Sequence, residues 1–218
     1  MTLVLLLAAV AATAWCVLQR QPGAGSSAAA RARSLRSPLV RLADLLGIET
    51  VRGRQANQYA AGAVGEKATA ARLKPLALSG WTVLHDRALP TGQANVDHLL
   101  VSPAGVVIVL DSKKWSAHHP LRVDGGRLMH GDKDVTDWLD GLRHGARTVA
   151  RVLSCPAIPL VSMEGAPLVG DQLVIDGIRI VPADRTVAVL RALARRHRAA
   201  GDHPGERAAA LFPPHRRK

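Results

Sequence analysis

Apolar and polar residues alternate along the chain in patterns that predict both helices and strands. Residues 57–74 carry small apolar side chains at the three- and four-residue spacing of a helix, and Pro75 is expected to limit that helix. Strands are predicted at 81–88, 94–102, 106–113, 158–163, 173–175 and 178–181, a small hairpin at 121–135, and further helices at 137–153 and 183–198. The order helix, three strands, helix, strand predicts an α/β domain around a mixed sheet.

The hairpin predicted over residues 94–113 specifies its own register. Pro103-Ala104-Gly105 suits a three-residue loop, because proline fits the first position of a type I turn and glycine fits the left-handed position after it. In that register Asp97 lies opposite Asp111. A two-residue loop would instead set Asp97 against Leu110 and put the two aspartates on opposite faces. The pairing of the aspartates therefore depends on the loop length.

Charged side chains end the second strand of this hairpin. Asp111 and Lys113 are two positions apart and share one face, since side chains alternate along a strand. Burial of such charges without partners is unfavourable, and carboxylates on neighbouring strands repel each other unless a cation lies between them. We therefore expect Asp97 and Asp111 to share a cation beside a phosphate. The alternatives are a solvated strand end, or a buried Asp97–Lys113 pair that needs no metal.

The chain begins with an apolar run. Residues 3–18 contain no charge and approach the ~17 residues needed to cross a bilayer. Arginines follow the run and none precedes it, so the positive-inside rule predicts a single-pass membrane anchor, residues 1–20, with the carboxyl side in the cytoplasm. A cleaved signal peptide is the alternative, although such peptides normally begin with positive charge.

The segments on either side of the predicted domain are basic. Residues 21–56 are predicted to be a linker, because their first part is rich in Gly, Ser, Ala and Arg and has no period. Four leucines allow a short amphipathic helix over 38–51, either on the membrane surface or packed on the domain. Residues 183–218 are predicted to be a basic helix followed by a disordered tail.

Composition and charge narrow the classes of partner. The net charge of +12 lies entirely in the flanks, because residues 20–54 and 185–218 are strongly basic whereas 55–184 is neutral. Basic flanks favour nucleic acid or an anionic membrane surface as partner, and a merely solvated arginine-rich surface is the alternative. Cys16 and Cys155 are too few for a disulfide framework or a zinc site.

Three short motifs occur in order along the predicted core. They are Gly-Ala-Val-Gly-Glu-Lys at 62–67, Asn-Val-Asp-His at 95–98 and Pro-Ala-Gly-Val-Val-Ile-Val-Leu-Asp-Ser-Lys-Lys-Trp at 103–115. In this order and spacing they resemble the nuclease-related domain (NERD), a family similar to the PD-(D/E)XK nucleases with a restriction-endonuclease-like fold. The resemblance covers residues 57–155 and, more loosely, extends to 182, which sets the predicted domain at 57–182.

The resemblance implies a role for each matching residue. Asp97 matches the aspartate of the second core strand, and Asp111 with Lys113 matches the (D/E)-x-K pair. The two aspartates and the main-chain carbonyl of Ser112 would hold Mg²⁺ or Mn²⁺, hard ions that prefer oxygen ligands. Lys113 would position or activate the attacking water and stabilise charge on the phosphate. Glu66 matches the helix glutamate, and would complete the metal shell through water or orient Lys113.

One part of the family pattern is absent. Many relatives carry a glutamine early in the helix after the third strand, whereas residues 137–144 here contain none. Lys114, Arg143 and Arg147 are the candidates for contacting nucleic acid, and Trp115 is expected to pack rather than stack on bases. The expected function is metal-dependent hydrolysis of DNA or RNA by a membrane-anchored protein. A non-catalytic nucleic-acid-binding module and a membrane-tethered scaffold are the alternatives.

Overall fold

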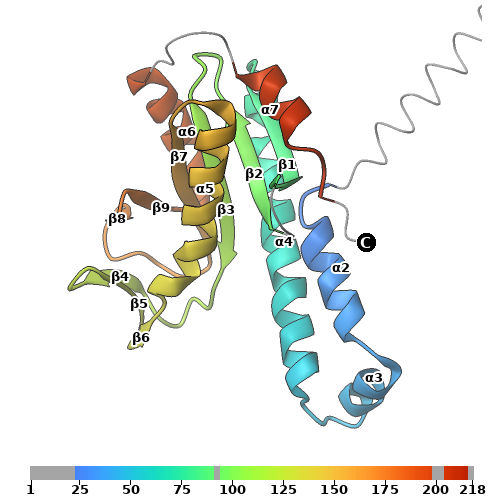
Figure 1. The fold of residues 1–218 in the computed structure, drawn as a ribbon. Coiled ribbons are helices and arrows are strands. Elements are labelled where there is room, and N and C mark those ends of the chain that lie inside the picture. Colours follow the sequence, from blue (N-terminus) through green and yellow to red (C-terminus); the bar gives the residue numbers. More distant parts are fainter. Residues whose placement is uncertain (1–22, 91–93, 198–203, 216–218) are drawn as a thin grey trace, which may run out of the picture.

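A mixed six-stranded sheet forms the centre of the protein (Figure 1). The structure is a computed structural model that describes residues 23–90, 94–197 and 204–215. The strands of the sheet are β1 (Thr82–Ala88), β2 (Asn95–Val101), β3 (Val107–Lys114), β7 (Ala157–Glu164), β8 (Leu173–Ile175) and β9 (Ile178–Pro182). Their order is β1-β2-β3-β7-β9-β8, with β3, β7 and β9 parallel and the other neighbours antiparallel. The predicted α/β fold with a mixed sheet is confirmed.

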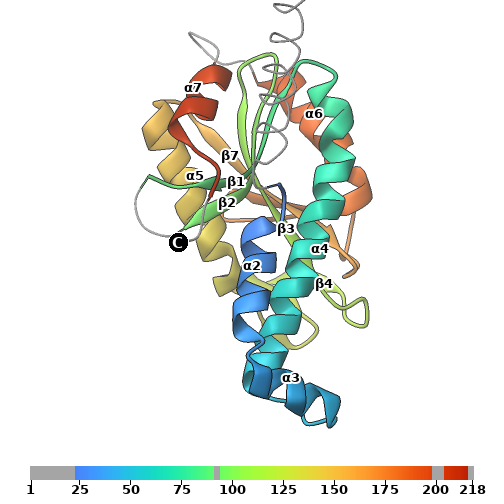
Figure 2. The same ribbon diagram turned by 90° about the vertical axis from the view of Figure 1, so that its right-hand side faces the viewer.

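Helices cover both faces of this sheet (Figures 1 and 2). The helices of the protein are α2 (Ser26–Leu35), α3 (Pro38–Leu45), α4 (Val51–Ala77), α5 (Asp140–Leu153), α6 (Thr186–Arg196) and α7 (Gly205–Leu211), of which α4 and α6 cover one face of the sheet and α5 and α7 the other. Ile108 and Leu110 of β3 pack with the leucines of α4 and α6 on one face. Val107 and Val109 pack with the apolar residues of α5 and α7 on the other. β3 is apolar on both sides because it is covered on both sides.

A second, small sheet lies between β3 and α5 in the chain. Its strands are β4 (Leu121–Asp124), β5 (Arg127–His130) and β6 (Lys133–Asp134). A 3₁₀ helix, η1 (Thr136–Leu139), connects it to α5, and another, η2 (Ala183–Arg185), precedes α6. The predicted hairpin at 121–135 is therefore present, with a third short strand. This sheet brings η1 back beside the end of β3, where it forms one side of a cleft.

The register of the β2–β3 hairpin is the predicted one. His98 pairs with Leu110 and Val101 pairs with Val107. The loop between them is closed by the Gly105 N–H, which donates to the Ser102 carbonyl at 2.8 Å, and Gly105 has a φ of +76°. Only glycine adopts that backbone conformation without strain. The three-residue loop therefore sets a register that brings the start of β2, with Asp97, beside the end of β3, where the Ser112 N–H donates to the Asp97 carboxylate.

Two segments that were expected to be irregular contain helices. Residues 26–35 of the predicted linker form α2, which packs along α4. Residues 205–211 of the predicted disordered tail form α7, and Phe212 after it is fully buried in the core. Both predictions weighed local composition alone, whereas contacts with distant segments stabilise these helices. α4 itself starts earlier than predicted and continues past Pro75, because the buried Leu76 keeps its last turn against the sheet.

The membrane predictions fall on different parts of the chain. The predicted anchor, residues 1–20, lies outside the described residues. Within the described residues, no helix is both long enough and apolar enough to span a bilayer. The predicted amphipathic helix is present as α3 at the far end of the α2–α4 pair (Figure 2). Its leucines are exposed, with Leu45 at 84%, so they do not pack on the domain.

Candidate active site

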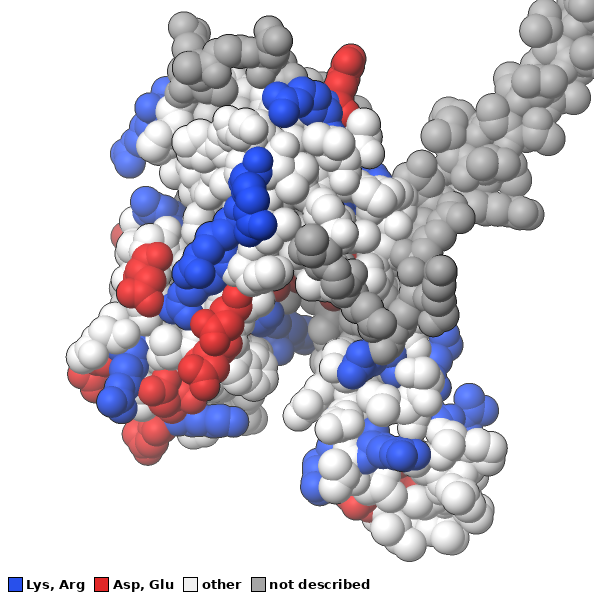
Figure 3. All heavy atoms as spheres, in the orientation of Figure 1, with Lys and Arg blue, Asp and Glu red and all other residues white. Residues whose placement is uncertain are grey.

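An open cleft of about 1610 Å³ separates the α2–α4 pair from the small sheet and η1. Figure 3 shows the hollow between these two parts of the molecule. The floor of the cleft is the start of β2 and the end of β3, including Asp97, Asp111 and Lys113. Pockets for small ligands usually enclose about 300–1,000 Å³. The larger, open cleft suits a polymer better than a small molecule.

Asp111 and Lys113 on β3 are in direct contact, as their shared face predicts. The Lys113 Nζ lies 2.7 Å from Asp111 Oδ2 and donates a hydrogen bond to Asp111 Oδ1 at 3.0 Å. Burial disfavours the charged ammonium, but the carboxylates of Asp111, Asp97 and Glu66 outweigh this effect and raise the pKa of Lys113. Lys113 is therefore a fixed positive charge at neutral pH and not a proton acceptor.

Asp97 lies beside this pair, at the start of β2. Its Oδ2 accepts a hydrogen bond of 2.9 Å from the main-chain N–H of Ser112, which ties the β2 carboxylate to β3. Burial raises the pKa of Asp97 well above its ordinary value, and the negative charges of Asp111 and Glu66 raise it further. A cation between these carboxylates would remove the repulsion.

Glu66 approaches Asp97 and Asp111 from a third element, α4. Gly65 allows this approach, because a Cβ added there would lie 3.2 Å from the Lys114 Cβ. The Glu66 carboxylate accepts a hydrogen bond from the Gly25 N–H, and its Oε2 is buried with no hydrogen-bond partner among the described residues. Burial, together with the charges of Asp86 and Asp111, raises the pKa of Glu66 to about 7.

The buried His98 and the partly buried His85 lie next to Ser112 of β3. His98 Nε2 lies 2.9 Å from the Ser112 hydroxyl, and the Nδ1 atoms of His98 and His85 lie 2.8 Å apart. Burial lowers the pKa of both imidazoles, so both are neutral and one Nδ1 donates to the other. His98 is a fully buried core residue. Ser112 is thus held at its hydroxyl by His98 and at its N–H by Asp97, which fixes the direction of its carbonyl.

Residues 61–162 match the family model of the nuclease-related domain. These residues are similar to the nuclease-related domain. The matched range contains Glu66, Asp97, Asp111 and Lys113, and the NERD resemblance of the motifs is confirmed. No curated protein and no solved structure matches the chain.

The predicted metal ligands all offer oxygen atoms. Asp97 and Asp111 offer carboxylates, and the fixed Ser112 offers a main-chain carbonyl. Among the residues that the structure describes, no group of three or more His, Cys, Asp or Glu side chains is placed to hold a metal ion. The predicted set needs only two such side chains, and hard ions such as Mg²⁺ complete their coordination with water. Burial, and then the repulsion from Asp111 and Glu66, raises the pKa of Asp97, and a cation at this place would offset both effects.

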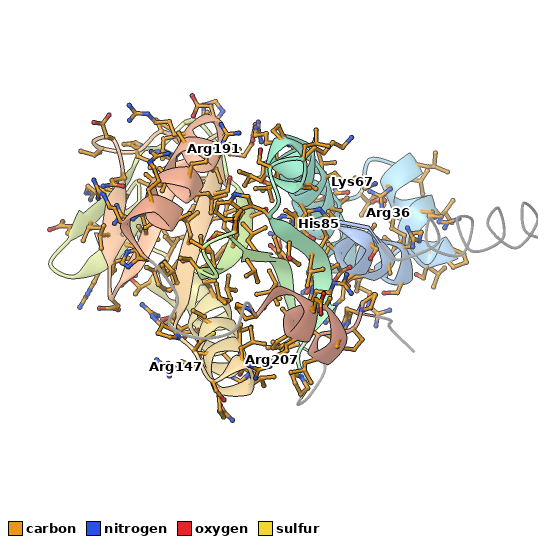
Figure 4. The ribbon with its side chains drawn as sticks, turned by 90° about the horizontal axis from the view of Figure 1, so that it is seen from above. Arg36, Lys67, His85, Arg147, Arg191 and Arg207 are labelled. Atoms are coloured by element: carbon orange, nitrogen blue, oxygen red, sulfur yellow. The ribbon has the colours of Figure 1, made fainter. Side chains whose placement is uncertain are left out.

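Of the three residues predicted to contact nucleic acid, one lines the cleft and two do not. Lys114 is exposed and lines the cleft. Arg143 instead pairs with Asp140 at 2.6 Å and with Asp176 at 2.7 Å, and it does not line the cleft. Arg147 extends outward from α5, away from the sheet (Figure 4). The structure therefore brings only Lys114 of these three to the carboxylates.

Asp86 is a site residue that the sequence pattern did not indicate. It is fully buried in β1 with a φ of +49°, and its carboxylate accepts hydrogen bonds from both Ser26 and Ser27 at the start of α2 and from Asn95. The Ser27 N–H donates at 2.9 Å and the Asn95 Nδ2 at 2.8 Å. Asp86 thereby caps α2 and holds the Gly25 N–H over Glu66. The only available signal was an aspartate inside a strand, where this residue type is depleted.

Proposed function

We propose that the NERD domain hydrolyses phosphodiester bonds of DNA or RNA in this cleft with the help of Mg²⁺ or Mn²⁺. The observation that carries the proposal is the meeting of three carboxylates and one lysine from three separate elements, α4, β2 and β3. Burial raises the pKa of Glu66 and of Asp97, and repulsion from neighbouring carboxylates raises both further. Perturbed groups that converge in a cleft are typical of catalytic sites. The order α4, β1, β2, β3, α5, β7 agrees with the core order of the PD-(D/E)XK nucleases that the motifs resemble.

Each residue then has a role that its position supports. Asp97, Asp111 and the Ser112 carbonyl would hold the divalent ion, which would supply Lewis-acid polarisation of the phosphate and of a water molecule. Lys113 remains protonated and stabilises the negative charge that develops on the phosphate oxygens. Glu66 has a buried, unpartnered Oε2 and a pKa of about 7, so it accepts a proton from the attacking water near neutral pH.

A cleavage assay tests this proposal directly. The full chain, purified in detergent, is incubated with labelled single- and double-stranded DNA and RNA in Mg²⁺, Mn²⁺ or EDTA. We expect cleavage that needs the metal and is lost in Asp111→Asn and in Lys113→Ala. Arg191→Ala, an exposed change on α6 (Figure 4), is the control that should remain active. Cleavage that survives Asp111→Asn would refute this site, and binding without cleavage in any metal would favour the non-catalytic module.

We also propose that the protein is attached to a membrane, with residues 1–20 as the anchor and the NERD domain on the cytoplasmic side. The observation that favours lipid contact is the exposed apolar surface of α3 and the turn after it. It consists of Leu39, Leu42, Leu45, Leu46, Ile48 and Val51. Arg36, Arg41, Arg52 and Arg54 in and next to this segment are exposed, and Figure 3 shows Lys and Arg side chains at this end of the molecule. Apolar residues flanked by arginines fit the surface of an anionic bilayer.

Hydrogen exchange distinguishes this arrangement from a domain that only hangs from its anchor. The full chain is reconstituted in vesicles of phosphatidylcholine with and without phosphatidylserine, and residues 38–46 are compared with residues 140–153. We expect slower exchange in α3 when the anionic lipid is present, and no change in α5. Equal exchange of α3 in both vesicles would contradict surface docking. Release of the chain from vesicles at alkaline pH would contradict the anchor.

A further inference from the structure

The aromatic side chains of the described residues are divided between the core and the cleft. Trp81 and Phe212 are buried in the core. The other three, Tyr59, Trp115 and Trp138, all line the cleft. Tyr59 comes from α4 on one side, and the two tryptophans come from the end of β3 and from η1 on the other. A chain with only 3% aromatic residues thus places three of them around the candidate active site.

A cationic side chain lies over each of the two most exposed of these rings. Trp138 is 48% exposed, and the Lys133 Nζ lies 5.9 Å from the centre of its ring. Tyr59 is 37% exposed, and the Arg31 guanidinium lies 5.3 Å from its ring centre. A flat ring next to a positive charge is the combination that binds a base together with its phosphate. Both sides of the cleft therefore offer contacts for a nucleotide chain.

Trp115 has a different role from Trp138. It packs against the apolar core beneath the small sheet, so its predicted packing role is confirmed. Its ring meets the Trp138 ring edge to face, with centres 4.9 Å apart and planes at 88°. Such a contact favours one orientation of the outer ring. Trp138 is held in place by Trp115 while about half of its surface remains open to the cleft.

We propose that the cleft binds a single-stranded segment of nucleic acid, with one base stacked on Trp138 and the adjacent phosphate near Lys133. This inference rests on the proposed function for the assignment of the cleft to nucleic acid, and adds the substrate class. Bases in a duplex are stacked on each other and paired, so their faces are closed to side chains. An aromatic ring gains stacking energy only from a base that has left the helix. The open face of Trp138 is therefore useful for a single strand and of little use for a duplex.

Binding in EDTA tests this inference without any cleavage. Fluorescence anisotropy of the full chain in detergent is measured with a labelled 20-nucleotide oligo(dT), the matching oligo(U), and a 20-base-pair DNA duplex. We expect both single strands to bind more tightly than the duplex. Trp138→Ala should weaken single-strand binding by about 5- to 100-fold, the range for loss of one base stack. Duplex binding should change little, and Trp138→Phe should retain most of the single-strand affinity.

The controls separate stacking from misfolding and from the cleavage proposal. Val174→Ala removes a similarly exposed apolar group on β8, which does not line the cleft, and should leave all affinities unchanged. Equal weakening of single-strand and duplex binding by Trp138→Ala, or a duplex that binds as tightly as the single strands, would overturn the inference. Stacking-dependent binding in a protein that never cleaves would support the inference and refute the nuclease proposal. Metal-dependent cleavage that is indifferent to Trp138→Ala would do the reverse.

Discussion

Replacement of Glu66 by glutamine tests the electrostatics of the site through stability. The pKa of Glu66 is raised from 4.5 to about 7, first by burial and then by the charge of Asp86. The folded protein therefore binds this proton more tightly than the unfolded chain does. Between pH 4.5 and 7 the unfolded chain has lost this proton while the folded protein still holds it. The free energy of unfolding therefore falls as the pH rises through this range. The full effect corresponds to about 3 kcal/mol above pH 7.

Glutamine keeps the shape and the acceptor for the Gly25 N–H but carries no charge. Chemical denaturation of wild type and Glu66→Gln is measured in EDTA at pH 4.5, 6 and 8. We expect similar free energies of unfolding at pH 4.5, and a variant more stable by up to about 3 kcal/mol at pH 8. Asp97 titrates in both proteins, but the Glu66 charge raises the pKa of Asp97, so the loss of that charge adds to the difference in the same direction. Glu49→Gln removes an exposed carboxylate and is the control for a change of net charge.

A pH-independent effect of Glu66→Gln would refute this account of Glu66. If the difference between wild type and Glu66→Gln is the same at pH 4.5 and pH 8, then Glu66 is not a destabilising buried charge. Its assignment as the proton acceptor would lose its physical basis. A difference of the opposite sign, with the variant less stable at pH 8, would mean that the charged carboxylate has strong partners that outweigh burial.

Three further changes probe other parts of the same arrangement. Mg²⁺ should raise the melting temperature of the wild type and have little effect on Asp111→Asn, as measured by thermal unfolding; at ten times the dissociation constant the stabilisation is about 1.4 kcal/mol. Gly65→Ala should reduce cleavage more than stability, because the added Cβ lies 3.2 Å from the Lys114 Cβ and pushes α4 from β3; normal cleavage would contradict this. Phe212→Ala should cost about 3–5 kcal/mol in denaturation, since the side chain is fully buried; an unchanged midpoint would mean that α7 contributes nothing.

The sequence was sufficient for features that depend on neighbouring residues. The Pro103-Ala104-Gly105 loop set the register of β2 and β3, because glycine chemistry at a turn acts over three or four residues. The contact between Asp111 and Lys113 followed from strand alternation alone. That Asp97 lies near Asp111 could be predicted as well, since a register once set extends along both strands.

Features that depend on distant segments could not be predicted in this way. The pKa of Glu66 reflects burial under Gly25 and proximity to Asp86, and neither lies near it in sequence. The histidine pair behind Ser112 needs the β1–β2 register, which sets His85 opposite His98 across a connection that no turn motif specifies. The helix α2 was predicted as linker, although its alanines and arginines have high helix propensity. Arg143 was a candidate phosphate contact until its partners Asp140 and Asp176 were known.

The chain before the family match is part of the candidate site. The match begins at residue 61. The hydrogen-bond donor to Glu66 is the Gly25 N–H, and Ser26 and Ser27 donate hydrogen bonds to Asp86. A Cβ at Gly25 would lie 2.6 Å from the Ala63 carbonyl oxygen, so α2 can approach α4 closely only with glycine there. A fragment that began at residue 57 would leave two buried carboxylates without these donors, and such groups are costly to bury unpaired. The protonation of Glu66, and with it any proton transfer in the cleft, therefore depends on a helix that the family match does not include.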